Sequence, residues 1–197
     1  MPPKVKVTKE EIINAAVDIV RNSGAQAINA RTVAAALRCS TQPIFSNFAT
    51  MEELRLAVVE RADVLCQEYM RREEESGKYP AYKANGMAYI RFAKEEKELF
   101  KLLYMRDRTC ETIPEETEHT DKMFAIIHQN TGLGGSDAKL FHLEMWAYVH
   151  GIATMFATGF FDLDWELVSK MLTDSYQGLR KQYGMEGLIW KPFESRD

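Results

Sequence analysis

Apolar residues recur every three or four positions along most of the chain, which is the spacing of one face of an α-helix. The first such stripe follows a capping box, Thr8-x-x-Glu11, in which each side chain can satisfy a free backbone N–H group. Gly24 ends the stripe, because glycine readily adopts the left-handed conformation that terminates helices. A first helix is therefore expected between these two signals. Its apolar positions are Ile12, Ile13, Ala16, Val17, Ile19 and Val20.

Two short helices are expected next. Asn29 is a suitable N-cap for a helix over residues 30–37, and Ser40 or Thr41 could cap another over residues 41–48. Only a few residues separate the two segments. The sequence therefore predicts two short helices joined by a tight turn.

The remaining helices are longer. Thr50 and Glu53 repeat the capping-box pattern at the start of a helix that we expect to reach about Glu75, and Asp162 or Asp164 could cap the last helix. No segment shows sustained alternation with a period of two, so we expect an all-α fold without a sheet. The other predicted helices cover residues 81–94, 96–105, 115–130, 137–158 and 164–183.

Composition restricts the class of protein. The 197 residues are 46% apolar and 27% charged, as in a soluble globular protein, and no apolar stretch reaches the ~18 residues of a membrane span. The N-terminus lacks the apolar segment of a secretory signal. Three cysteines lie far apart without a Cys-x-x-Cys motif, which argues against a disulfide framework and a zinc site. We therefore expect a cytoplasmic protein with no membrane partner, metal or cofactor.

Charge is distributed unevenly along the chain. The net charge is −4, which alone argues against nucleic-acid binding. Residues 1–50, however, hold six lysines and arginines against three acidic residues, a net +3. The other 19 basic and 26 acidic residues give residues 51–197 a net −7. A small basic segment attached to an acidic body fits a protein whose N-terminal part meets a polyanion, although chance could also produce this difference.

Residues 30–48 have the dimensions of a helix-turn-helix, the unit that places its second helix in the major groove of DNA. Val33 and Leu37 can pack on the first helix, and Ile44 and Phe48 can pack inward from the third. Glutamine and asparagine can pair with adenine, and threonine can contact the thymine methyl group. The alternative is an ordinary three-helix packing unit with a polar face. The side chains left facing outward are Thr41, Gln42, Ser46 and Asn47.

The same region resembles a known family. Residues 8–55 combine motifs that look like the N-terminal domain of TetR/AcrR-type transcriptional repressors. In that family the third helix reads bases, while the starts of the second and fourth helices and an aromatic residue on the third contact phosphates. The motifs are Ile12-Ile13-x-Ala15-Ala16-x-x-Ile19-Val20-x-x-x-Gly24, Arg31-x-Val33-Ala34-x-x-Leu37, Ser40-x-x-x-Ile44-Phe45-x-x-Phe48 and Glu53-Leu54.

The resemblance implies a set of DNA contacts. Phe45, Asn47 and Met51 stand where the family often has tyrosine, histidine and lysine. Fewer cations release fewer counterions, so we expect a shallower salt dependence of binding. The expected DNA-binding residues are Asn29, Arg31, Thr32, Ser40, Thr41, Gln42, Pro43, Phe45, Ser46, Asn47, Thr50 and Met51.

The resemblance also implies a domain plan. It comprises a helix-turn-helix DNA-binding domain over residues 1–52, a helical ligand-binding and dimerisation domain over 53–187, and a tail over 188–197. Trp146-x-x-x-His150-Gly151 looks like a pattern found in one subset of the family. The last two long helices would pair with their twofold mates as a four-helix bundle. Their apolar residues exceed the needs of one helix pair, which fits an obligate interface, although an intrachain core is the alternative.

The helices between these regions are rich in aromatic residues and methionine, which can line an adaptable apolar pocket. His128, His142 and His150 stand at apolar positions and could serve there as polar groups for a ligand. Such residues at helical spacing also occur in ordinary cores, so both interpretations stay open. The candidate ligand-binding residues are Tyr89, Phe92, Phe100, Tyr104, Met105, Met123, Phe124, His128, Trp146 and His150.

Motifs for catalysis are absent from the sequence, which has no Gly-x-Ser-x-Gly, His-Glu-x-x-His or phosphate-binding loop. We therefore predict a non-enzymatic homodimer that binds a double-stranded DNA operator. We expect it to be a repressor that a small apolar or amphipathic effector releases from DNA. One alternative is a helical dimer that binds a ligand or protein partner without sequence-specific DNA binding. A helical enzyme using His128 or His150 is a further alternative.

Overall fold

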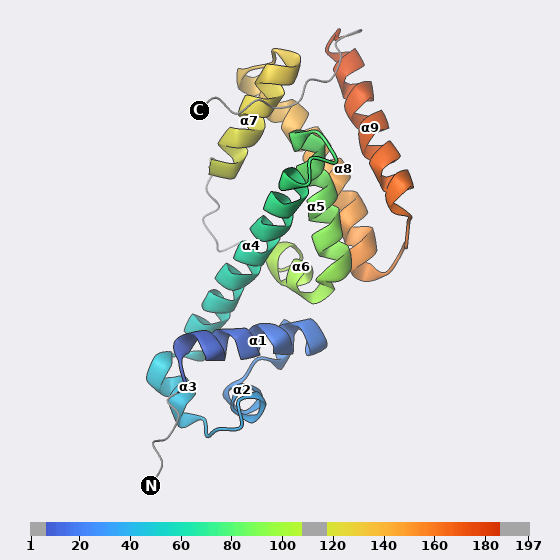
Figure 1. Ribbon diagram of the computed structural model, residues 1–197. Coiled ribbons are helices and arrows are strands. Elements are labelled where there is room, and N and C mark those ends of the chain that lie inside the picture. Colours follow the sequence, from blue (N-terminus) through green and yellow to red (C-terminus); the bar gives the residue numbers. More distant parts are fainter. Residues whose placement is uncertain (1–6, 108–117, 186–197) are drawn as a thin grey trace. The chain divides into compact units, whose positions relative to one another are not determined.

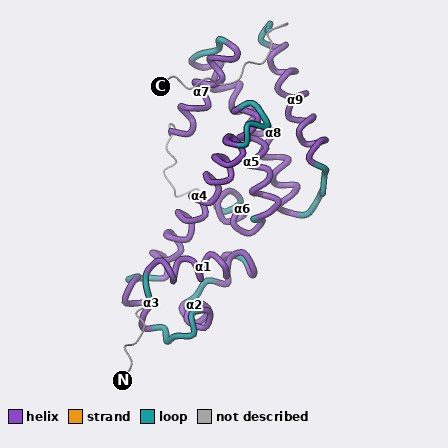
Figure 2. Tube along the Cα trace, in the orientation of Figure 1, coloured by secondary structure: helices purple, strands orange, loops and turns teal. Residues whose placement is uncertain are grey.

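The computed structural model describes residues 7–107 and 118–185 (Figures 1 and 2). Within these ranges the chain forms helices and loops with no strand, which confirms the expected all-α fold. The helices expected from the sequence occur in the expected order. The predicted tail, 188–197, and the first residues of the predicted helix 115–130 lie outside the described residues. The helices are α1 (Lys9–Ser23), α2 (Ala30–Ala36), α3 (Gln42–Asn47), α4 (Met51–Glu75), α5 (Ala81–Glu95), α6 (Lys97–Tyr104), α7 (Glu118–Thr131), α8 (Gly135–Thr158) and α9 (Trp165–Gln182).

Most of the predicted caps are present. The Thr8 hydroxyl accepts the Glu11 N–H at 3.2 Å, and the Glu11 carboxylate accepts the Thr8 N–H at 2.8 Å. Asp164 caps α9 by accepting the Leu167 N–H at 2.8 Å. Gly24 ends α1 with a φ of +80°. These local signals therefore fix several helix ends before any tertiary packing is considered.

The predicted side-chain cap of the third helix is wrong. Helix α3 begins after Thr41, but the Thr41 side chain makes no capping hydrogen bond. Pro43 occupies the second helical position and has no N–H group to donate. The next N–H, that of Ile44, already donates to the Thr41 carbonyl at 3.1 Å. Both amides that a cap would take are therefore absent or engaged.

Contacts between residues divide the chain into two compact units. The head unit comprises residues up to Gln67 together with Glu95–Arg106, and the body unit comprises Glu68–Lys94 and the residues from Asp107 onward. Helix α4 contributes residues to both units, whereas α6 lies in the head unit.

The head unit is built around the buried face of α1. Helices α2, α3 and α6 each pack against α1. Arg21 on α1 also makes two hydrogen bonds of 2.8 Å to the Glu96 carboxylate, which lies just before α6. The buried apolar residues include Ile12, Ala16, Val20, Val33, Ile44, Phe48, Leu54, Leu99 and Phe100.

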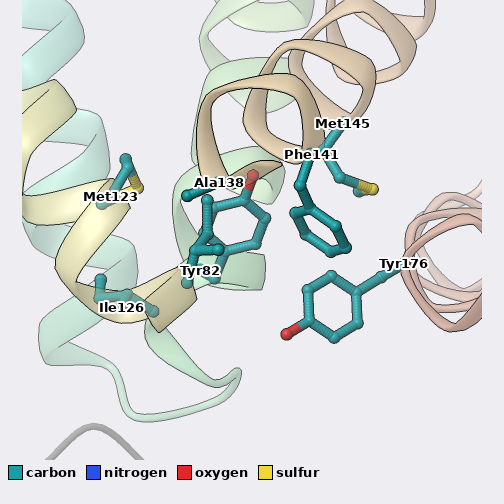
Figure 3. Packing of buried hydrophobic residues seen from close by; sticks show 8 residues of the cluster. Tyr82, Met123, Ile126, Ala138, Phe141, Met145 and Tyr176 are labelled. Atoms are coloured by element: carbon teal, nitrogen blue, oxygen red, sulfur yellow. The ribbon is translucent and has the colours of Figure 1, made fainter. Parts of the chain in front are cut away.

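The body unit has an aromatic and methionine-rich core formed by α5, α7, α8 and α9. Figure 3 shows Phe141 of α8 grouped with Tyr82 and Tyr176, which come from α5 and α9. The ring centroids of Phe141 and Tyr176 are 5.4 Å apart in an edge-to-face arrangement, which favours aromatic pairs. The buried members are Tyr82, Met123, Ile126, Ile127, Ala138, Phe141, Met145 and Tyr176.

Candidate functional site

Helices α2 and α3 are held against α1 by three fully buried apolar side chains. Val33 of α2 and Ile44 of α3 are inaccessible to solvent, and Phe48, directly after α3, is almost so. These residues are the ones that the spacing predicted to point inward. Packing of this kind fixes the angle between α2 and α3 and leaves the opposite surface of both helices facing solvent.

None of the twelve residues expected to contact DNA is buried. Phe45 is 54% exposed, which is unusual for a large aromatic residue and indicates a surface available to a partner. Thr32, Thr41, Pro43, Asn47 and Met51 are half-buried. The exposed members are Asn29, Arg31, Ser40, Gln42, Phe45, Ser46 and Thr50.

The outward polar row on α3 differs from the prediction. Gln42 and Ser46 are exposed, but Thr41 and Asn47 are half-buried. The Asn47 amide donates to the carbonyl of Pro43 at 2.8 Å and to that of Val7 at 3.5 Å. An asparagine near a helix end commonly bonds to its own backbone in this way. The prediction that Asn47 faces fully outward is therefore wrong, and Gln42 is the most accessible amide of the helix.

The start of α2 is rigidly capped. The Asn29 side-chain oxygen, Oδ1, accepts the backbone N–H groups of Arg31 and Thr32, each at 3.0 Å. The Thr32 hydroxyl donates to the Ala27 carbonyl at 2.7 Å and accepts the Asn29 N–H at 3.1 Å. The Asn29 and Thr32 side chains thus hold the backbone in place. Arg31 between them is exposed and carries the positive charge of this turn.

The candidate effector residues fall in both units. Phe100, Tyr104 and Met105 belong to the head unit, and the remaining candidates belong to the body unit. Phe100 is buried, and its ring contacts that of Tyr104, whereas Met105 is exposed. The candidate effector residues, which the sequence analysis gave as one set, are therefore divided between the two units. Tyr89, Phe92 and Met123 are buried in the body unit, Phe124 and His150 are half-buried, and His128 and Trp146 are exposed.

His128 does not occupy an apolar position, contrary to the prediction. Its side chain is exposed, and its Nδ1 lies 3.0 Å from the Leu133 carbonyl, across the bend that follows α7. It therefore closes a turn at the surface.

His150 lies within an aromatic group on α8. Its Nδ1 is 2.9 Å from the Tyr89 hydroxyl, and the Trp146 ring stacks on its ring with centroids 4.9 Å apart. Burial lowers the pKa of His150, because a desolvated imidazole resists protonation. The Trp-x-x-x-His spacing on a helix places the two rings one turn apart, which explains the stack. The arrangement places an imidazole between a tyrosine hydroxyl and a tryptophan ring in the body unit.

A second tyrosine–histidine pair was missing from the predicted site. The Tyr82 hydroxyl lies 3.0 Å from His142 Nδ1, and the Phe124 ring meets the His142 ring edge-on at 5.5 Å. Burial, with a contribution from the charge of His119, lowers the pKa of His142 to about 4. The sequence signal is the spacing: Tyr82 and Tyr89 are two turns apart on α5, as His142 and His150 are on α8.

Arg180 is a further residue that the sequence did not single out. It is only 2% exposed, and its Nε and Nη2 have no hydrogen-bond partner among the described residues. Its guanidinium carbon lies 6.0 Å from the centre of the Tyr176 ring, at the outer limit of a cation–π contact. This contact connects the end of α9 to the aromatic core shown in Figure 3.

Within the described residues, no helix is long and apolar enough to cross a membrane. The same residues contain no group of three or more His, Cys, Asp and Glu side chains that could hold a metal ion.

Comparison with known proteins gives a family match for about half of the chain. Residues 82–175 match the family of tetracyclin repressor-like C-terminal domains. A TetR-like transcriptional regulator from Rhodococcus sp. RHA1 is 16% identical, with 95% of this chain and 99% of that chain covered and a TM-score of 0.62. A TetR-family protein from Streptomyces coelicolor A3 is 18% identical, with 85% and 96% covered and a TM-score of 0.59. No curated protein sequence matches the chain.

The chain has the all-α fold of TetR-like transcriptional regulators. Residues 82–175 belong to the family of tetracyclin repressor-like C-terminal domains.

Proposed function

We propose that the protein is an effector-responsive repressor that binds a double-stranded DNA operator as a homodimer. Residues 1–52 serve as the DNA-binding domain, and residues 53–187 bind the effector and form the dimer. The observation that carries the proposal is the helix-turn-helix, whose apolar side is buried on α1 while Gln42, Phe45 and Ser46 remain exposed. An amide, an aromatic ring and a hydroxyl on one short helix suit contacts with base edges in a major groove.

The outer face of α8 supports a second copy of the chain as the dimer partner. Leu140 and Leu143 are 50% and 58% exposed, and Ala147 and Gly151 continue the same face at helical spacing. Leu167 on α9 adds another exposed leucine. A helix that is apolar on both its inner and its outer face is usually covered on both sides. Self-pairing of this face would give a twofold dimer and would present two heads to an operator with inverted repeats.

The body unit supports a small apolar or amphipathic effector. Tyr89 and His150 form one hydroxyl–imidazole pair, and Tyr82 and His142 form another. Aromatic walls with a few polar groups are typical of sites for such molecules. Helix α4 runs from the head unit into the body unit, so it is the element through which a change in one unit would reach the other. To shift the equilibrium by ~2.7 kcal/mol, the effector must bind the released state about 100-fold more tightly.

Selection of bound sequences from a pool of random DNA duplexes tests the DNA-binding part of the proposal. The full-length protein should enrich an inverted repeat, and fluorescence anisotropy with that duplex should show binding that weakens with salt. Gln42→Ala should weaken binding by about 1–3 kcal/mol and relax the base preference at its contact. Gln129→Ala, which removes an exposed glutamine of α7, is the matched control and should bind normally. Recovery of no preferred sequence would favour the helical dimer without sequence-specific DNA binding.

A further inference from the structure

Arg38 has an unusual backbone conformation in the turn between α2 and α3. Its φ is +52°, and no other described residue except glycine has a positive φ. L-amino acids pay about 1–2 kcal/mol in this left-handed region, whereas glycine adopts it freely. The turn itself is made by main-chain hydrogen bonds, Arg38 N–H to the Ala35 carbonyl at 3.1 Å and Cys39 N–H to that of Ala34 at 3.0 Å. Glycine would make the same bonds, so the turn does not require the arginine side chain.

The ion pairs made by the cations within residues 7–67 distinguish Arg38 from most of its neighbours. Six lysines and arginines lie within residues 7–67, and four of them pair with carboxylates. The other two, Arg31 and Arg38, are exposed and make no side-chain hydrogen bond or ion pair with any described residue. The paired cations and their partners are Lys9 with Glu53, Arg21 with Glu96, Arg55 with Glu52 and Arg61 with Glu10.

The two unpaired arginines lie at the helix-turn-helix. Arg31 is in the first turn of α2, and Arg38 is in the turn that leads into α3. Gln42, the first residue of α3, follows Arg38 by four positions. Contacts to phosphates fix the register and angle of a recognition helix, while its other side chains contact bases. A free guanidinium beside the start of that helix is placed to make such a contact.

We propose that Arg38 contacts a phosphate of the DNA and is retained at a cost in backbone energy for this purpose. The inference rests on the proposed DNA-binding function and adds a residue to the interface. It also assigns the role of each part of the residue. The main chain shapes the turn, and the guanidinium supplies charge that complements the DNA backbone.

Three substitutions separate the side-chain charge from the backbone conformation. Arg38→Ala removes the charge and keeps the unfavourable φ, Arg38→Gly removes both, and Arg38→Lys keeps both the charge and the φ. Arg71→Ala removes an exposed arginine of α4 in the body unit and controls for net charge. Each full-length variant is titrated with a fluorescein-labelled 30-base-pair duplex of mixed sequence over a series of KCl concentrations.

We expect Arg38→Ala and Arg38→Gly to bind about tenfold more weakly than the wild type at low salt. Their plots of log affinity against log salt should be shallower by about 1 for each head that contacts the duplex. Arg38→Lys should stay within about threefold, because a lysine also neutralises a phosphate. Arg38→Gly should in addition melt about 2–4 °C higher than the wild type, whereas Arg38→Ala should not.

The outcomes distinguish the two proposals. If the wild type binds DNA but Arg38→Gly and Arg38→Ala keep its affinity and salt slope, the role assigned to Arg38 is wrong and the proposed function stands. If the wild type binds no duplex, even at low salt, the proposed function fails and the role of Arg38 fails with it. A variant that is more stable yet binds DNA more weakly supports the inference, since a purely structural residue would not behave in this way.

Discussion

The surface of α3 and the outer face of α8 are both exposed, but they differ in chemistry. The short helix α3 exposes an amide, a hydroxyl and a single aromatic ring, and no side chain caps its start. Helix α8 presents leucines and small residues along several turns. Polar groups suit a polar partner with which they can form hydrogen bonds, whereas an extended apolar surface suits a partner whose surface is also apolar. We therefore expect the two surfaces to bind different classes of partner.

The largest expected effect comes from placing a charge on the apolar surface. Leu143→Glu should prevent self-pairing, because a carboxylate would be buried without a partner. Since a dimer contacts two half-sites, we expect the monomer to bind the selected operator at least about 100-fold more weakly. Size-exclusion chromatography with light scattering measures the oligomeric state, and anisotropy measures binding.

Leu56→Glu is the control for this substitution. Leu56 lies on α4 in the head unit and is 57% exposed, against 58% for Leu143. The control variant should remain dimeric. An equal loss of dimer in both variants would show that the face of α8 has no special role.

A substitution at a buried position of the head unit tests whether the surface of α3 and the face of α8 act independently. Ile44→Ala removes apolar atoms from a fully buried position and should cost about 2–4 kcal/mol of stability in the head unit. The recognition helix would lose its support, so operator binding should fall while the protein stays dimeric. Chemical denaturation with light scattering on the same sample measures both quantities. Loss of the dimer in this variant would contradict the separation of the two surfaces.

The pH dependence of stability is expected to show a smaller effect from the body core. The pKa of His142 is about 4 in the folded protein, below the ordinary value of 6.5, so the unfolded chain takes up a proton first as pH falls. The free energy of unfolding is therefore highest above pH 6.5 and falls as the pH approaches 4, by about 3 kcal/mol in total. Urea denaturation at pH 7 and pH 5 should therefore give a larger difference for the wild type than for His142→Gln.

The exposed His128 provides the control, because its replacement by glutamine should leave the difference between the two pH values unchanged. A wild-type difference that persists in His142→Gln would assign the pH dependence to other groups, among them His150.

Local signals predicted much of the fold. The caps at Thr8, Asn29 and Asp164 depend on residues within three positions of one another, so they can be recognised without tertiary structure. The cap of α3 is absent because Pro43 has no N–H group to donate and the Ile44 N–H donates to the Thr41 carbonyl. A capping prediction must therefore check that each backbone N–H group near the start of the helix is present and free.

The candidate sites were predicted less completely because they depend on contacts between helices. The pair of Tyr82 with His142 joins residues 60 positions apart, and periodicity along one helix cannot indicate which helix faces it. Phe100 belongs to the head unit because α6 packs on α1. No motif in the sequence of α6 predicts this packing. Arg38 was overlooked because its importance lies in a backbone angle, which side-chain patterns do not reveal.

The leucines on the outer face of α8 also have a consequence for how the protein behaves at low abundance. With a second copy covering this face, folding and pairing form one equilibrium, and the melting temperature rises with the number of molecules per cell. A newly made chain would then spend its first moments with these leucines uncovered and open to chaperones or proteases. Such a protein would be long-lived only when it is made fast enough for its concentration to support the dimer.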